Sequence, residues 1–149
     1  MLRRLGAWAL LAVIAVACGG GPSTQDKLAV ETAYLHSWDT YADAVLRLDT
    51  SQLEQSFIDP ILTTTRKEIE RRIQQQCPSS VSIEHHITIT SLHSTTAELF
   101  DDELNHSVLL DPATRAPKEA DPNQKQRDRV TMQKIGGVWM VASIAPAKT

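Results

Sequence analysis

Residues 81–90 read Val-Ser-Ile-Glu-His-His-Ile-Thr-Ile-Thr, and this stretch decides the fold. Apolar side chains at positions 81, 83, 87 and 89 alternate with polar ones, and His85 shares their phase. Successive side chains of a strand point to opposite faces, so the alternation predicts a β-strand with one buried face. The segment also divides the chain, because helical spacing of apolar residues precedes it and strand spacing follows it.

Three helices are predicted before this strand. The first spans residues 25–48, a short second helix spans 53–57 after a capping residue, and Asp59-Pro60 opens the third. Acidic residues separate the apolar positions of the first helix and give its other face to water. Its predicted buried stripe consists of Leu28, Leu35, Trp38, Ala42 and Val45, flanked by Tyr34, Tyr41 and Leu46.

Three further strands are predicted at residues 95–110, 126–135 and 138–144. Gly136-Gly137 joins the last two, as expected for a two-residue hairpin turn that needs positive φ. Residues 111–123 hold three prolines and several charges, which predicts an exposed loop. In the expected hairpin register Ile135 faces Val138, Met132 faces Val141 and Val130 faces Ser143. Helices followed by an antiparallel sheet predict an α+β domain with helices packed on one sheet face.

This order of three N-terminal helices and a curved four-stranded antiparallel sheet resembles the nuclear transport factor 2-like superfamily. The local similarities are the long helix at Val30–Leu48, the short helix and turn at Asp49–Pro60, and the closing hairpin at residues 129–141 with its tryptophan. The resemblance implies a cone in which the sheet curls around the first helix and leaves a pocket. Members include ketosteroid isomerases, polyketide cyclases, dehydratases and non-catalytic binding or assembly domains, so the fold does not choose the function.

The N-terminus resembles a bacterial lipoprotein leader. Thirteen uncharged residues, Leu5 to Ala17, follow Arg3 and Arg4 and end directly before Cys18. We therefore expect residues 1–17 to be a signal peptide, Cys18 the lipidation site, residues 18–24 a flexible tether and residues 25–149 the domain. Lipid on Cys18 would anchor the protein at the outer face of the bacterial cytoplasmic membrane or cell envelope. Cys77 then has no partner for an intramolecular disulfide.

Charge and motifs exclude several functional classes. Removing residues 1–17 moves the formal net charge from −3 to −5, which does not fit a nucleic-acid binder. There is no glycine-rich phosphate loop and no serine nucleophile elbow, so no cofactor is predicted. His85 and His86 point to opposite faces of a strand and cannot grip one ion together, and the other histidines lack metal-ligand spacing. No metal site is predicted.

The candidate catalytic residues are His85, Asp101, Tyr34 and Tyr41. Isomerases and dehydratases of the superfamily use a carboxylate or histidine base with a hydroxyl donor, and these four residues match that site in type. Structural roles are favoured over catalysis for both: His85 as a hydrogen-bonded core residue, and Asp101 as part of an acidic strand edge. Trp38, Trp139 and His85 are the candidates for lining a pocket.

A second apolar surface is predicted on the outer face of the sheet. Apolar surface of this size is expected to be covered by a second copy of the chain, by an envelope protein or by the loop at residues 111–123. Its expected members are Ile135, Val138, Met140, Ala142 and Ile144.

The sequence thus favours a membrane-anchored, exported lipoprotein with a non-catalytic binding or assembly domain. The alternative is a small-molecule isomerase, cyclase or dehydratase with its site between the first helix and the sheet. The alternative requires His85, Asp101 and a tyrosine hydroxyl to converge on a cavity that solvent reaches.

Overall fold

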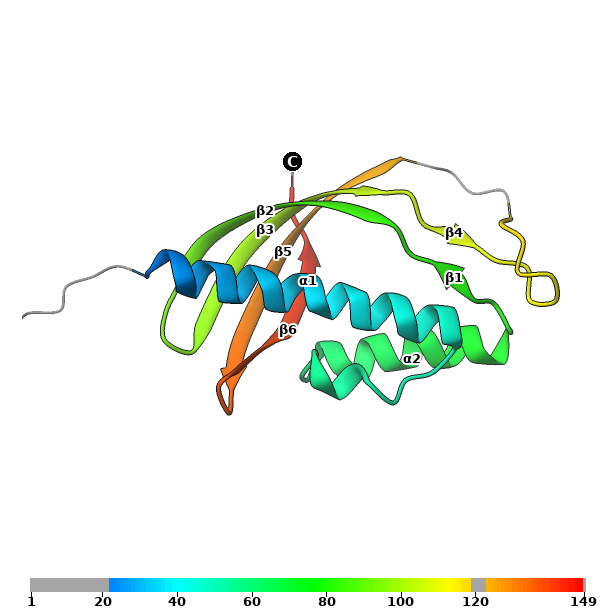
Figure 1. Cartoon of the computed structure of the whole chain (residues 1–149), viewed down its shortest axis with the longest axis horizontal. Helices are drawn as coiled ribbons and strands as arrows, with labels where there is room; N and C mark the ends of the chain where they lie inside the picture. The colour runs from blue at the N-terminus through cyan, green and yellow to red at the C-terminus, as the bar shows by residue number, and fades with distance from the viewer. Residues whose placement is uncertain (1–21, 119–122, 149) are drawn as a thin grey trace, which may run out of the picture.

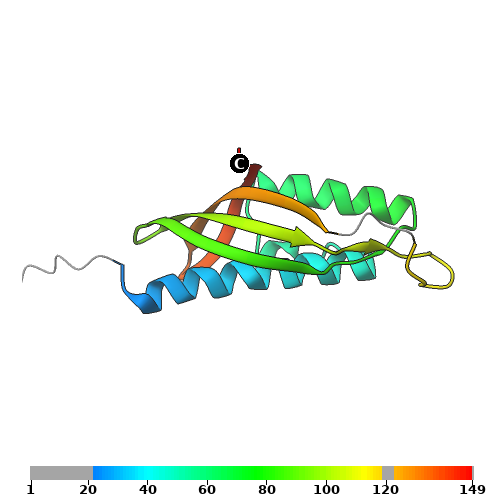
Figure 2. The ribbon, with the colours of Figure 1, turned by 90° about the horizontal axis from the view of Figure 1, so that it is seen from above.

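The computed structural model describes residues 22–118 and 123–148. A curved antiparallel sheet arches over one long helix, and a second helix packs beside the C-terminal half of the first (Figures 1 and 2). The predicted α+β class is confirmed, whereas Cys18 and most of the leader and tether lie outside the described residues. No helix in the described part of the chain is both long and apolar enough to cross a membrane. The elements are α1 (Thr24–Arg47), η1 (Leu53–Gln55), α2 (Ile61–Gln74), β1 (Ser79–Ser80), β2 (Ile83–Leu92), β3 (Thr96–Asn105), β4 (Val108–Leu109), β5 (Gln124–Ile135) and β6 (Val138–Pro146).

Helix α1 begins where the sequence supplies a cap. Ser23 accepts a hydrogen bond from the backbone N–H of Asp26 at 3.1 Å, and the Asp26 carboxylate accepts one from the backbone N–H of Ser23 at 3.1 Å. This reciprocal capping box satisfies two donors that a helix start leaves free. The helix ends at Leu48, whose left-handed φ of 58° turns the chain away.

Two predictions about the elements are wrong. The expected second helix is only the 3₁₀ turn η1, so the domain has two α-helices and not three. The expected strand at residues 95–110 breaks after Asn105, because the Asn105 side chain accepts the Ser107 backbone N–H at 2.8 Å and bends the chain. The sheet is therefore split into a four-stranded part of order β2-β3-β5-β6 and a two-stranded part, β1-β4.

The closing hairpin carries a β-bulge that the alternation did not reveal. Ile135 pairs with Val138 and Met132 with Val141 as predicted, but Val130 pairs with Ile144 and not with Ser143. Ala142 is the extra residue of this bulge, and it reverses the facing of the residues that follow it. Ile144 therefore packs against the core and does not belong to the outer face.

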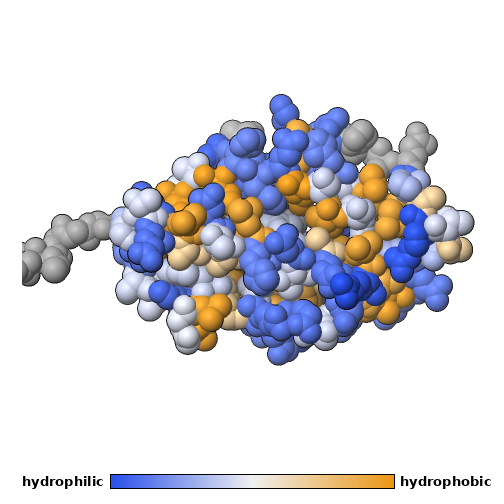
Figure 3. Space-filling model, in the orientation of Figure 1, coloured by the Kyte–Doolittle hydropathy of each residue, from blue (hydrophilic) through white to orange (hydrophobic). Residues whose placement is uncertain are grey.

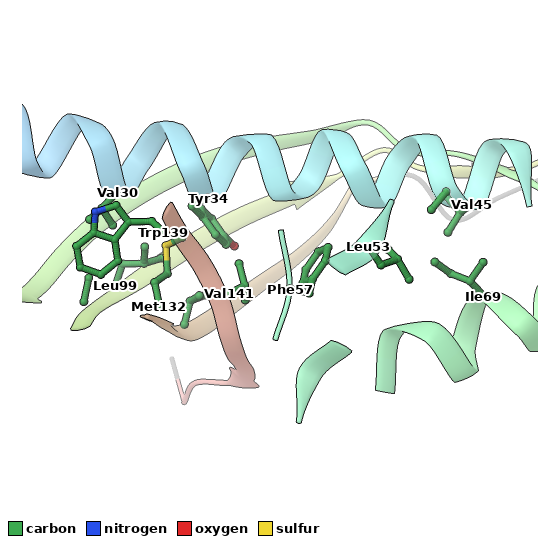
Figure 4. Packing of buried hydrophobic residues seen from close by; sticks show 13 residues of the cluster. Val30, Tyr34, Val45, Leu53, Phe57, Ile69, Leu99, Met132, Trp139 and Val141 are labelled. Atoms are coloured by element: carbon green, nitrogen blue, oxygen red, sulfur yellow. The ribbon is translucent and has the colours of Figure 1, made fainter. Parts of the chain in front are cut away.

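The buried face of α1 also differs from the predicted stripe, because Leu28 is 61% exposed and Leu35 is 37% exposed. The buried stripe runs through Val30, Tyr34, Ser37, Thr40, Ala44 and Val45. Figure 4 shows the resulting core in two apolar groups, with the Tyr34 ring between them. One group contains Val30, Leu99, Met132 and Trp139, and the other contains Val45, Leu53, Phe57 and Ile69.

Candidate functional site

A hydrogen-bonded polar group lies inside the cone, between α1 and the concave face of the sheet. His85 Nδ1 lies 2.5 Å from Asp101 Oδ2, and the Tyr34 hydroxyl donates to the same oxygen at 3.0 Å. The backbone N–H of His86 donates to Asp101 Oδ1 at 3.0 Å. Asp101 and Tyr34 are fully buried, while the His85 side chain keeps 12% exposure. The structure therefore brings together three of the four residues predicted as catalytic candidates.

Two further carboxyl groups extend this group along the same face. Glu103 is 6% exposed, and its Oε1 lies 3.5 Å from the Tyr34 hydroxyl. Asp128 is 2% exposed and stands directly opposite Asp101 in the β3–β5 register. Its Oδ2 accepts from the Gln126 side chain at 2.7 Å, while its Oδ1 makes no hydrogen bond within the protein. We call Tyr34, His85, Asp101, Glu103 and Asp128 the interior polar cluster.

Burial and nearby like charges raise the pKa values of Tyr34, Glu103 and Asp128 in this cluster. Burial, and then the charges of Asp101 and Asp128, raise the pKa of Glu103 to about 8. Burial also raises the pKa of Asp128 above its usual range, although the Gln126 hydrogen bond opposes the change. The pKa of Tyr34 is raised far above its ordinary value by burial and by Asp101. The Tyr34 hydroxyl therefore remains a proton donor, and Glu103 is protonated at neutral pH.

Aromatic rings cover the histidine. Trp38 tilts over His85 with ring centroids 5.3 Å apart, and Tyr34 meets both rings edge-on at 6.5 Å and 6.0 Å. Edge-on and tilted contacts of this kind are favourable for aromatic pairs. The indole Nε1–H of Trp38 is buried and completes no regular hydrogen bond with a described residue, although it lies near enough to the Tyr34 hydroxyl to oppose the rise in the pKa of Tyr34.

Two clefts lie near the interior polar cluster. One, of about 310 Å³, opens between α1, α2 and the ends of β5 and β6, and Trp38 and Asp128 form part of its wall. The other, of about 420 Å³, lies mainly on the outer face of the sheet, because most of its lining residues have the outward strand phase: His86, Asp102, Leu104, Lys125 and Arg127. The cluster therefore borders open space on the side of the first cleft.

The other predicted site residues lie apart from the cluster. The Tyr41 hydroxyl donates to Glu68 of α2 at 2.9 Å, and Tyr41 meets only the Trp38 ring, at 5.6 Å. Trp139 is 7% exposed and belongs to the apolar group around Val30, with the Lys134 ammonium 5.6 Å from its ring centre.

Neither Glu103 nor Asp128 was predicted as a site residue from the sequence. Strand phase could have found both of them. Glu103 lies on the same face of β3 as Ala97, Leu99 and Asp101, and Asp128 lies on the same face of β5 as Val130 and Met132.

Comparison with known proteins identifies the fold. No protein-family model matches the chain, and no curated protein matches it. The intermembrane-space region of the chloroplast protein ARC6 is similar with a TM-score of 0.65 at 12% identity, covering 86% of this chain and 100% of that chain. A protein assigned as a scytalone dehydratase from Novosphingobium aromaticivorans gives a TM-score of 0.54 at 15% identity, covering 85% of this chain and 89% of that chain.

A type 2 hexachlorocyclohexane dehydrochlorinase, LinA, gives a TM-score of 0.50 at 11% identity, covering 85% of this chain and 94% of that chain. Likenesses at these identities show the fold alone. The two α-helices, the curved antiparallel sheet and these neighbours together establish that the chain has the nuclear transport factor 2-like fold.

Proposed function

We propose that this chain is an exported, lipid-anchored domain that binds a small molecule between α1 and the sheet. The observation that carries the proposal is a pair of unmatched polar atoms, Trp38 Nε1 and Asp128 Oδ1, on two residues that wall the same cleft. A buried polar group without a partner costs about 1–3 kcal/mol. A ligand that accepts from Trp38 and donates to Asp128 would recover part of that cost.

The cleft wall indicates the chemistry of the ligand. Side chains of α1, the segment before α2, and β6 make most of the wall apolar or aromatic, and carboxylates of Asp128 and Glu68 supply acceptors. Sites of this type bind compact apolar molecules and orient them with few polar contacts. We therefore propose a mainly apolar ligand with at least one hydroxyl or amine group. The apolar residues of the wall are Trp38, Tyr41, Phe57, Ile61 and Ile144.

Fluorescence of Trp38 tests this proposal. Trp8, Trp38 and Trp139 are the only tryptophans, and Trp8 belongs to the proposed leader, so a Trp139→Phe variant of the processed protein reports Trp38 alone. We expect a panel of monocyclic and bicyclic phenols, alcohols and amines to contain molecules that shift its emission saturably. Asp128→Asn should weaken that binding at least tenfold. Asp102→Asn should not, because Asp102 lies on β3 and faces the outer side of the sheet. Equal affinity in both variants would exclude the cleft.

The anchoring proposal rests on the leader sequence. Cys18 lies six residues before the first residue of α1, so the tether is short. We expect Cys18→Ala to release the protein from bacterial membranes and Cys77→Ala to leave it membrane-bound. Membrane fractionation with mass spectrometry of the N-terminal peptide measures both. An unlipidated Cys18 on membrane-bound protein would contradict the proposal.

The outer sheet face is a proposed contact between two copies of the chain. Ile135 and Val138 are more than half exposed there, next to the partly buried Met140. Figure 3 shows a different side of the molecule, the one that carries α1, where apolar and polar residues are intermixed. A Val138→Glu variant should reduce the molecular mass measured by sedimentation from dimer to monomer. A wild-type chain that sediments as a monomer at high concentration would refute this contact.

A second candidate function is acid–base catalysis on a small molecule. The specific observation is the His85–Asp101 contact, because a carboxylate that accepts Nδ1–H fixes the imidazole tautomer with a free Nε2 for proton transfer. The dehydratase and dehydrochlorinase among the structural neighbours add weak support. The reaction would be removal of a proton beside a carbonyl or leaving group, with Tyr34 positioning Asp101.

Substrate turnover decides between binding and catalysis. A ligand identified by Trp38 fluorescence that is chemically converted by the wild type but not by His85→Gln would establish catalysis. A ligand recovered unchanged after long incubation with the wild type would leave binding as the function.

A further inference from the structure

We propose that His85, Asp101 and Glu103 form a binding site for a divalent transition-metal ion of the zinc type. Each residue offers one ligand atom, and the three atoms lie within 4.8 Å of one another. Bonds from zinc to nitrogen and oxygen are about 2.0–2.2 Å long, so two ligands of one tetrahedral ion lie about 3.4 Å apart. Small side-chain rotations would bring the three atoms to that spacing, with His85 Nδ1 and Asp101 Oδ2 opening from 2.5 Å.

The donor set and its charge suit a divalent cation. Imidazole nitrogen and carboxylate oxygen are the usual zinc ligands after cysteine, and two carboxylates balance the charge of one dication. Among residues 22–118 and 123–148, no lysine or arginine forms an ion pair with Asp101, Glu103 or Asp128. Buried carboxylates without a cationic partner are costly, and a bound dication would supply that partner.

The surrounding hydrogen bonds orient the ligands as a metal site requires. The His86 backbone N–H holds Asp101 Oδ1, which leaves Oδ2 directed at His85. The Tyr34 hydroxyl lies 3.0 Å from Asp101 and 3.5 Å from Glu103, so one donor bridges both carboxyl groups. Partners of this kind fix the orientation of ligating carboxylates in metal proteins. The three ligands come from adjacent strands, β2 and β3, whose pairing holds them together.

Asp128, which also walls the proposed small-molecule cleft, places a buried acceptor beside these three residues. Its side chain is 98% buried, its Oδ1 makes no hydrogen bond with any described residue, and it stands across from Asp101 on the same face. A buried acceptor without a partner calls for a donor. A water molecule carried by the ion would provide that donor, and Asp128 would then serve beside the three direct ligands.

This site adjoins the proposed small-molecule cleft through Asp128 but takes its three direct ligands from other residues, and the ion competes with the proton between His85 and Asp101. Zinc binding should therefore release protons and strengthen with pH, because the ligands must lose their protons. If the histidine acts as a base, added zinc would inhibit it.

Calorimetry of the full chain, purified in detergent and treated with EDTA, tests the site with zinc chloride and manganese chloride as probes. We expect one zinc ion per chain and a zinc-dependent rise in Tm. Glu103→Gln, which keeps the shape of the side chain, should weaken binding at least tenfold and abolish the rise in Tm. Asp102→Asn, an exposed neighbour on the same strand, should bind like the wild type.

A surface histidine is the main competing explanation. His106 lies 3.0 Å from Glu84 on the exposed side and could hold zinc weakly. The proposal is overturned if zinc binding survives Glu103→Gln, if His106→Gln removes it, or if the wild type shows no saturable binding with one ion per chain. Visible absorption of the cobalt-loaded chain provides a second readout, because a tetrahedral His/carboxylate site absorbs strongly and loose surface sites do not. A folded Glu103→Gln variant with unchanged cobalt spectrum would likewise refute the site.

Discussion

The free energy of unfolding of the wild type should fall as the pH rises, because buried Glu103 must lose its proton. Glu103→Gln should remove most of that fall. Burial beside Asp101 and Asp128 raises the pKa of Glu103 from its ordinary 4.5 to about 8. Between those two pH values the folded chain keeps a proton that the unfolded chain has lost. The folded state therefore binds more protons, and the free energy of unfolding falls as the pH rises through this window. Below pH 4.5 both states are protonated, and the contribution is constant.

The size of the effect follows from the same pKa. At about 1.4 kcal/mol per pH unit, the full change amounts to at most about 5 kcal/mol. Charges at buried sites behave as if the protein had an effective dielectric constant of about 20, so we expect roughly half of that or less, about 2 kcal/mol. Glutamine resembles the protonated carboxyl in shape and never ionises, so the variant should gain about 2 kcal/mol over the wild type between pH 5 and pH 8.5.

Urea unfolding at pH 5, 6.5 and 8.5 in EDTA, followed by tryptophan fluorescence, measures this difference. EDTA is needed so that no bound cation takes the place of the proton. Asp102→Asn is the matched control, because that carboxylate is 53% exposed on the other face of the strand and should leave the pH dependence unchanged. If the free energy of unfolding depends on pH in the same way for the wild type and for Glu103→Gln, the raised pKa of Glu103 is refuted.

Four other substitutions test a buried hydrogen bond, the core packing and the helix cap. Tyr34→Phe removes one donor from the buried Asp101 and should lower the free energy of unfolding by about 1–3 kcal/mol, measured by urea titration. Ile144→Ala should lower the free energy of unfolding by about 2 kcal/mol, because Ile144 packs on the core. Val138→Ala, at a 55% exposed position, should lower it by less than about 0.5 kcal/mol. A larger loss for Val138→Ala than for Ile144→Ala would contradict the bulge. Ser23→Ala removes the cap of α1 and should lower Tm by an amount equivalent to about 1 kcal/mol, with unchanged helicity and Tm as the contrary result.

Periodicity predicted the parts of the fold that depend on one repeating pattern. Residues 83–92 and the hairpin around Gly136-Gly137 alternate regularly, and they form β2 and the β5–β6 turn. A bulge adds one residue without changing composition, so the reversal at Ala142 could not be read from alternation. The buried face of α1 was misjudged for a related reason. Leu28 and Leu35 are more apolar than Ser37 and Thr40, but Ser37 and Thr40 are the buried pair, and their hydroxyls donate to backbone carbonyls of the preceding turn of α1.

The polar interior was predictable in part. Strand phase placed His85 and Asp101 on the inner face, and the Tyr34–Asp101 bond joins residues 67 positions apart. Only the packing of α1 across the sheet brings those positions together. Tyr41 has the same residue type as Tyr34, but it reaches Glu68, because it points toward α2. Residue types were therefore enough to predict the kind of site, but only the tertiary structure shows which tyrosine belongs to it.

The segment before α2 also limits which edge of this sheet can pair with another strand. Phe57 lies parallel to Val141, with Ile58 N–H donating to the Val141 carbonyl at 2.9 Å and Val141 N–H donating to the Ser56 carbonyl at 2.8 Å. The free side of β6 is thus occupied at its centre, and in the described chain only β2 presents a long unpaired backbone edge. Any incoming peptide or second copy that extends the ladder must add beside β2, and two copies that pair β2 to β2 would use both long open edges and end the ladder.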